Sequence, residues 1–112
     1  MIYKMRLQKE PFELIKLGKK TIELRLYDEK RQKIKVGDKI EFTNRDTNET
    51  IETLVIALHR YDSFKELYQH FDKSLLGYNE EQIPNYQDME LYYPISDQEQ
   101  YGVVGIEIKL LP

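Results

Sequence analysis

Three polar side chains in the segment 18–25 have the types and spacing to bind an anion or to move a proton. Glu23 and Arg25 are two positions apart on a predicted strand, so both point to the same side of it. A guanidinium binds phosphate or carboxylate groups through paired N–H donors. Glu23 can orient this guanidinium, accept from a base amino group or act as a general base. The alternative interpretation is an exposed ion pair that contributes at most about 1 kcal/mol.

Lys20 lies at the junction between a predicted helix and this strand. A lysine that is partly removed from water can act as a base, and one that stays charged can hold a phosphate. The alternative is a solvated lysine near the C-terminus of a helix, where a positive charge is favourable. The residues alone leave both interpretations open.

Tyrosine is the dominant aromatic residue, with nine tyrosines against four phenylalanines and no tryptophan. Tyr27 shares the predicted polar face of the strand, and Tyr92, Tyr93 and Tyr101 lie near the C-terminal end of the chain. Tyrosine rings stack on unpaired bases with about 1–3 kcal/mol per base. The same rings can instead pack the ends of a barrel with their hydroxyls at the surface.

Several other chemistries are excluded or not indicated by the sequence. The chain has no cysteine, which rules out disulfides, thiolate nucleophiles and zinc–thiolate sites. His59 and His70 are the only histidines, and their spacing to Asp62 and Asp72 matches no common zinc motif. No glycine-rich phosphate loop is present. We therefore expect neither a metal nor a cofactor.

Charge is distributed unevenly along the chain, whose formal net charge is −3. Residues 1–50 contain 13 Lys and Arg against 9 Asp and Glu, whereas residues 51–112 contain 4 against 11. Such asymmetry indicates a polyanionic partner for the basic half, although scattered surface charges would give the same count. The pI near 5.4 disfavours non-specific duplex DNA binding.

The hydropathy pattern predicts one domain over residues 1–112 of the α+β class, a small mixed β-barrel with helical inserts. Period-two alternation predicts strands, and apolar positions three or four apart predict helices. The predicted elements are strands 2–7, 21–27, 39–43, 50–60 and 101–111, helices 10–17, 64–71 and 85–92, and a loop over 96–100. The longest apolar run is five residues, 54–58, where a membrane span needs about 20. With no apolar signal segment at residues 1–12, we expect a cytoplasmic protein without membrane contact.

Four segments resemble one known family in order and spacing. They are residues 18–25 (GKKTIELR), 34–42 (IKVGDKIEF), 92–94 (YYP) and 101–108 (YGVVGIEI). Together they resemble the ASCH domain family, and small stand-alone ASCH proteins in particular. The resemblance implies a PUA-like β-barrel and a ligand cleft lined by the first segment. It implies RNA or a nucleotide-type ligand in this cleft, and together with the stacking tyrosines we expect the binding residues to be Lys20, Thr21, Glu23, Arg25, Tyr27, Tyr93 and Tyr101.

The resemblance also implies a catalytic alternative. Some ASCH proteins are amidohydrolases that deacetylate N4-acetylcytidine, and others are described as ribonucleases. In the amidohydrolases a lysine that corresponds to Lys20 is thought to activate a threonine three positions later. Glu23 occupies that threonine position here, and Thr21 corresponds to a different position of the motif. If the chain is an enzyme, Lys20 and Glu23 are its expected catalytic residues.

Three hypotheses follow from the sequence. The first is a module that binds RNA or a nucleotide in a polar cleft around Lys20, Glu23 and Arg25, with RNA favoured over duplex DNA because unpaired bases can stack on aromatic rings. The second is a small hydrolase that acts on a modified nucleoside or on RNA. The third is a non-catalytic domain that binds another protein and leaves the cleft without a ligand.

Overall fold

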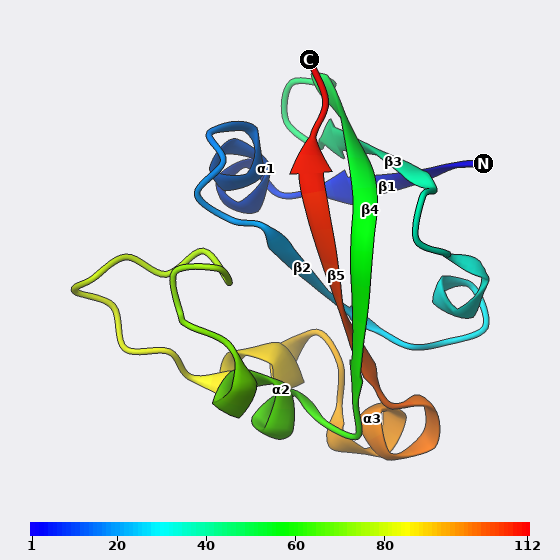
Figure 1. Ribbon diagram of the computed structural model, residues 1–112. Coiled ribbons are helices and arrows are strands. Elements are labelled where there is room, and N and C mark those ends of the chain that lie inside the picture. The colour runs from blue at the N-terminus through cyan, green and yellow to red at the C-terminus, as the bar shows by residue number, and fades with distance from the viewer.

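The computed structural model describes residues 1–112 as five strands, three α-helices and two 3₁₀ helices (Figure 1). In chain order these are β1 (Ile2–Leu7), α1 (Lys9–Lys16), β2 (Ile22–Leu26), η1 (Arg31–Lys33), β3 (Lys39–Asn44), β4 (Thr50–Tyr61), α2 (Phe64–His70), η2 (Tyr86–Leu91), α3 (Ile95–Tyr101) and β5 (Val103–Leu110).

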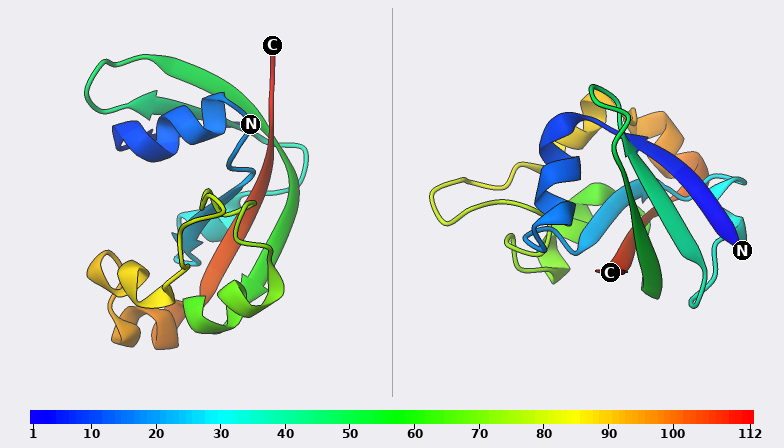
Figure 2. Two further views of the ribbon diagram at one scale, coloured as in Figure 1. Left: turned by 90° about the vertical axis from the view of Figure 1, so that its left-hand side faces the viewer. Right: turned by 90° about the horizontal axis from the view of Figure 1, so that it is seen from above.

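All five strands form one sheet in the order β1-β3-β4-β5-β2. β1 pairs with β3 in parallel, and every other pair is antiparallel. The sheet curls into a half-barrel, with α1 and the β3–β4 hairpin at one end and η2 and α3 at the other (Figure 2). This architecture confirms the predicted α+β, PUA-like fold, and it leaves β1 and β2 as the two edges of the sheet.

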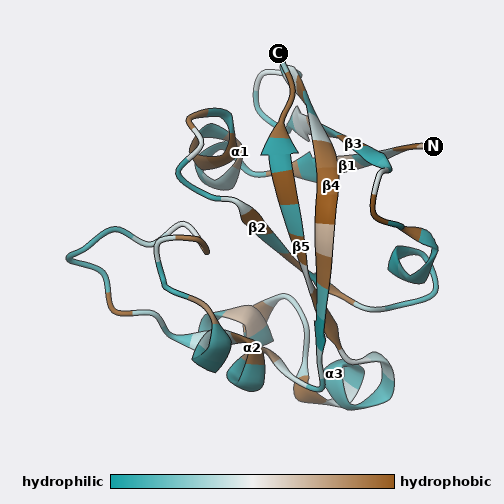
Figure 3. Cartoon of the chain, in the orientation of Figure 1, coloured by the Kyte–Doolittle hydropathy of each residue, from teal (hydrophilic) through white to brown (hydrophobic).

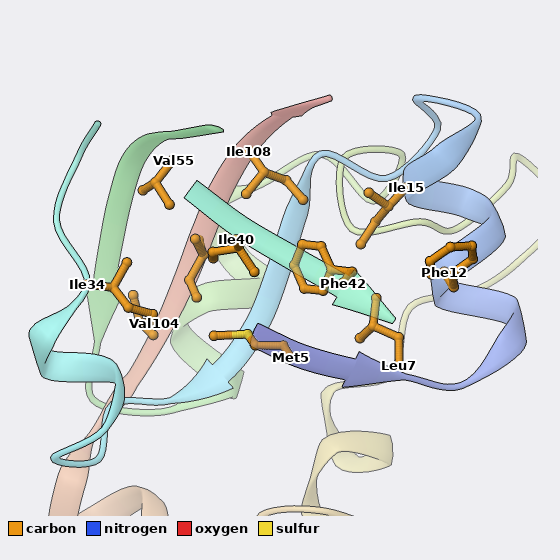
Figure 4. Packing of buried hydrophobic residues seen from close by; sticks show 11 residues of the cluster. Met5, Leu7, Phe12, Ile15, Ile34, Ile40, Phe42, Val55, Val104 and Ile108 are labelled. Carbon is orange, nitrogen blue, oxygen red and sulfur yellow. The ribbon is translucent and has the colours of Figure 1, made fainter. Parts of the chain in front are cut away.

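The concave side of the sheet holds the larger hydrophobic core (Figure 4). Helix α1 covers one end of this core because its apolar residues Phe12 and Ile15 face Leu7 and Phe42. The core consists of Met5, Leu7, Phe12, Ile15, Ile34, Ile40, Phe42, Val55, Val104, Ile106 and Ile108. Alternating hydrophobic and hydrophilic positions are visible along β5 (Figure 3). They are the period-two signal from which the strands were predicted.

The convex side of β2 and β5 is covered by α2 and the segment that follows it. Helix α2 (Phe64–His70) is capped by Ser63, whose hydroxyl accepts from the Glu66 N–H at 3.2 Å. Packing is close at Gly105 of β5, where an added Cβ would lie 3.0 Å from Ile22 Cγ2. The residues buried on this side form a second, smaller hydrophobic cluster. It consists of Ile22, Leu24, Leu26, Phe64, Leu67, Leu76 and Val103.

The predictions for the last third of the chain are partly wrong. The segment 96–100, predicted as a loop, lies within α3, and the strand predicted from residue 101 begins at Val103. The reason is tertiary: Gln98 is buried on α3, accepts from the Phe64 N–H at 3.0 Å and donates to the Tyr93 carbonyl at 2.8 Å. The third predicted helix, over 85–92, is the shorter 3₁₀ helix η2 (Tyr86–Leu91). None of the helices has the length and apolar character needed to cross a membrane.

Candidate functional site

The polar face of β2 lies beside the gap between the two edge strands, β1 and β2. This gap is called the seam below. Glu23 is opposite Ile106 of β5 and Arg25 is opposite Val104. Because directly paired residues of neighbouring strands point to the same face, Glu23 and Arg25 point to the concave side, beside the hydrophobic core. An edge strand has no neighbour on its other side, so these two side chains are next to both the core and the gap between β2 and β1.

Glu23 is the centre of a buried ion-pair network. Its side chain holds two cations, with Lys20 Nζ 3.3 Å from Oε1 and the Arg25 guanidinium bound through Nε and Nη2 at 3.1 and 2.9 Å from Oε2. Oε1 also accepts from the Leu24 N–H at 3.3 Å. Only 4% of Glu23 is exposed. Removal of three charged groups from water is costly unless the geometry compensates, and such clusters in a hollow are typical of functional sites.

The network changes the acidity of its members. Burial by itself would raise the pKa of Glu23, but the charges of Lys20 and Arg25 and the hydrogen bonds they donate hold it below its ordinary value. Burial likewise opposes the charge of Arg25, but Glu23 and the neighbouring Tyr93 phenol raise the pKa of that guanidinium above its ordinary value. Glu23 is therefore a carboxylate and Arg25 a cation throughout the physiological pH range.

A cleft of about 330 Å³ opens beside this network, a volume at the lower end of small-ligand sites. Four cationic side chains line it, and besides Glu23 only Glu10 adds a negative charge. One guanidinium N–H of Arg25 also donates to the backbone carbonyl of Arg6 at 3.4 Å, which connects the edge strands β2 and β1 across the floor of the seam. The cleft is lined by Arg6, Leu7, Gln8, Glu10, Pro11, Lys20, Glu23, Leu24, Arg25, Arg45, Met89, Tyr92 and Tyr93.

Lys20 is positioned by the end of α1 and by the loop that follows α2. The Lys19 and Lys20 N–H groups both donate to the Leu14 carbonyl, which turns the chain from α1 toward β2. Gly77 packs on the stem of Lys20, and a Cβ at Gly77 would lie 3.2 Å from Lys20 Cδ. Gly77 also has a φ of +99°, which residues with a side chain rarely adopt. The glycine therefore allows both this turn of the backbone and the close contact with Lys20.

The aromatic wall of the cleft is provided by Tyr92 and Tyr93 after η2. The Tyr93 ring is stacked on Phe64 with centroids 5.7 Å apart, and its backbone carbonyl is held by Gln98. Tyr92 is 60% exposed and so presents its ring to solvent at the rim. One ring is therefore fixed in position, and the other is accessible to a planar ligand.

The structure brings together four of the seven ligand-binding residues predicted from the sequence, Lys20, Glu23, Arg25 and Tyr93. Thr21 instead lines a separate hollow between α1 and the 74–82 loop. Tyr27 and Tyr101 line a third hollow, where Arg60 lies over the Tyr27 ring at 4.1 Å from its centroid. Tyr27 lies just beyond the last residue of β2, and its ring packs against the larger core.

Sequence reasoning missed the two rim arginines. Arg6 is on the outward-facing side of β1, and Arg45 follows β3 in the hairpin turn. Their proximity depends on the parallel pairing of β1 with β3, in which Arg6 is opposite Thr43 and the Arg45 N–H donates to the Leu7 carbonyl at 2.9 Å. No local sequence pattern could have indicated this pairing.

The residue types in the cleft limit the chemistry available there. No serine, threonine, histidine or cysteine lines it, so the side chains that could act as a nucleophile or base are Lys20 when neutral, the tyrosine hydroxyls and the carboxylates of Glu10 and Glu23. Both oxygens of Glu23 are already bound to cations or to an N–H. The chain has no group of three or more His, Asp or Glu residues arranged to hold a metal ion.

Comparisons with known proteins show the family and the fold of this chain. The family model of the ASCH domain matches residues 5–112, nearly the entire chain. The chain belongs to the ASCH domain family. Its fold, often associated with RNA binding, is thus the one expected from the 18–25 and 34–42 segments. None of the curated proteins compared with the chain matches it.

Solved structures show how far this ASCH fold extends to other proteins. The crystal structure of the hypothetical protein PH0355 is 36% identical, with a TM-score of 0.83 over 99% of this chain and 100% of that one. The solution structure of PF0455 from Pyrococcus furiosus is 39% identical, with a TM-score of 0.71 over 99% and 98%. The ASCH protein of Zymomonas mobilis is 16% identical, with a TM-score of 0.66 over 96% and 66%, and shares the fold alone.

Proposed function

We propose that this ASCH domain binds a nucleotide unit of RNA in the cleft around Lys20, Glu23 and Arg25. The observation that carries the proposal is the buried network in which one carboxylate holds both cations in fixed positions. Charged groups that are already oriented and partly dehydrated bind a ligand without the cost of ordering them first. An ordinary surface ion pair would not be buried to this extent.

The residues that line the cleft match the phosphate and the base of a nucleotide. Lys20, Arg25 and the rim arginines Arg6 and Arg45 supply positive charge for a phosphate, and guanidinium groups bind phosphate through paired N–H donors. The exposed ring of Tyr92 supplies a surface on which an unpaired base can stack. Thr21, Tyr27 and Tyr101 lie in other hollows, so the proposal gives them no contact with this nucleotide.

The same geometry favours binding over hydrolysis. A general base needs a free lone pair, and the carboxylate of Glu23 is held by Lys20, by Arg25 and by the backbone. Its lowered pKa also keeps it from serving as an acid near neutral pH. No serine or threonine hydroxyl lines the cleft to take the role of the threonine that Glu23 replaces in the motif.

The test is a binding titration with a matched pair of variants. At low salt, purified protein is titrated with nucleoside monophosphates and with short single-stranded RNA. Lys20→Met keeps the stem that packs on Gly77 but removes the charge, and Lys19→Met removes an exposed charge from the neighbouring position outside the cleft. We expect Lys20→Met to bind at least about tenfold more weakly while Lys19→Met stays close to the wild type.

Two results would contradict the proposal. The first is the absence of binding of either ligand by the wild-type protein at low salt. The second is an equal effect of Lys19→Met and Lys20→Met, which would show that general surface charge and not the cleft attracts the RNA. Mass spectrometry of the same mixtures, together with mixtures that contain acylated cytidines, reports turnover. Product formed by the wild type but not by Lys20→Met would support the hydrolase alternative instead.

A further inference from the structure

A second hollow, of about 320 Å³, adjoins the cleft on the other side of Arg25. It is called the basic hollow below, and it is lined by Tyr3, Lys4, Met5, Arg6, Arg25, Lys30, Arg31, Ile34 and Arg45. Arg6, Arg25 and Arg45 line both the cleft and the basic hollow, so the two are continuous along the seam between β1 and β2.

Besides Arg25 of β2, the basic hollow gathers cations from three other parts of the chain. Lys4 and Arg6 are on β1, Lys30 and Arg31 are at the start of η1, and Arg45 is in the β3–β4 hairpin. Its lining contains no acidic residue, although the whole chain carries a net charge of −3. A random placement of surface charge on an acidic protein does not favour such a concentration.

Most of these cations have no counter-charge in the protein. Lys4, Arg6, Lys30 and Arg45 form no ion pair. Arg31 pairs with Asp28 at 2.8 Å, but its Nε is buried and has no hydrogen-bond partner. Like charges held close together repel one another, so an anion that enters the hollow relieves this repulsion and supplies the missing acceptor.

The cleft and the basic hollow together contain more cationic side chains than the phosphate of one nucleotide can contact. A monophosphate places its single charged group next to its sugar and base, so a nucleotide seated in the cleft has no further phosphate that could contact Lys4, Lys30 or Arg31. Further phosphates would reach them only if the chain of nucleotides continued past Arg25. A base held in the cleft must also be unstacked from its neighbours, which single strands permit at low cost.

We propose that the basic hollow binds the phosphodiester backbone of single-stranded RNA, next to the nucleotide in the cleft, so that the ligand is an oligonucleotide and not a free nucleotide. This inference rests on the proposed function of the cleft. The rim arginines Arg6 and Arg45 bridge the two subsites, and Lys4 and Lys30 contact phosphates beyond the cleft.

The experiment compares a six-nucleotide single-stranded RNA with nucleoside monophosphates, using fluorescence anisotropy and competition. The variant Lys4→Gln/Lys30→Gln removes two exposed charges that line the basic hollow but not the cleft. The control Lys65→Gln/Lys109→Gln removes two exposed charges from α2 and β5 and has the same net charge. Inorganic phosphate is included as a competitor at matched phosphate concentration.

We expect the wild type to bind the hexanucleotide at least about tenfold more tightly than any monophosphate. The variant at the basic hollow should lose most of this advantage, and its monophosphate affinity should match that of the control. The slope of log K against log salt should become shallower by about 1.4, since each phosphate contact of a single strand contributes about 0.7.

The outcomes separate the two proposals. Equal hexanucleotide binding by the variant and the control would overturn the role of the basic hollow while leaving the cleft in place. Displacement of the RNA by inorganic phosphate at matched concentration would also overturn it, because the hollow would then be a general anion site. Failure of the wild type to bind any nucleotide or RNA would refute the proposed function and this inference with it.

Discussion

Replacement of Glu23 by glutamine tests whether one buried carboxylate holds the site together. Glu23→Gln keeps the shape of the side chain but removes the charge that neutralises Lys20 and Arg25. Glu23 is only 4% exposed, and the two cations would be left close together with little water to screen them. Loss of one partner of a buried ion pair costs about 3–5 kcal/mol.

We expect the lower end of this range, about 3 kcal/mol, because the amide oxygen can still accept one hydrogen bond. For a domain of this size about 1 kcal/mol corresponds to about 4 °C, so the melting temperature should fall by about 12 °C. Glu10→Gln is the matched control. Glu10 also lines the cleft but forms no ion pair and is exposed, so its replacement should change the melting temperature little.

The pH dependence provides a second, independent readout. The pKa of Glu23 is lowered in the folded protein, so its stabilising effect is complete above the pKa of an unfolded glutamate, about 4.3, and is lost as the pH falls through the folded value. The stability difference between the wild type and Glu23→Gln should therefore be constant near neutral pH and shrink below about pH 4. Urea unfolding at several pH values measures it. A variant as stable as the wild type at pH 7, or a difference that does not shrink in acid, would refute the reasoning.

Three further variants test the supports of the cleft. Gly77→Ala adds a Cβ 3.2 Å from Cδ of Lys20. Gly37→Ala is the control, because Gly37 has a similar φ, +97°, but no atom near the position of an added Cβ. Both should lose about 1–3 kcal/mol of stability from backbone strain, but only the first should also weaken ligand binding in a titration. Gln98→Ala leaves the Phe64 N–H and the Tyr93 carbonyl without their hydrogen-bond partner. It should lower the free energy of unfolding, measured in urea, by about 1–3 kcal/mol. Tyr92→Ala should weaken RNA binding by about 1–3 kcal/mol, and Tyr101→Ala, in a different hollow, should not; equal losses would argue against stacking at the rim.

Local sequence patterns were sufficient for most of the elements and for the choice of residues at the centre of the site. Alternation of apolar and polar residues indicated the strands, and apolar positions three or four apart indicated α1 and α2. The two-residue spacing of Glu23 and Arg25 placed both on one face of β2, and Lys20 three positions earlier came within 3.3 Å of that carboxylate. The first relation depends only on residues two positions apart on one strand, whose common face follows from backbone geometry, whereas the contact of Lys20 also depends on the end of α1 and on Gly77, which hold the lysine in place.

Only the tertiary structure decided which surface this polar face meets. Burial of Glu23 follows from its position opposite Ile106 at the edge of the sheet, and the rim arginines Arg6 and Arg45 reach the cleft through the parallel pairing of β1 with β3. Helix α3 likewise depends on Gln98, whose two hydrogen-bond partners are 34 and 5 positions away. The pairing between distant strands and the curl of the sheet depend on burial of the whole core. They therefore cannot be predicted from any short segment of the sequence.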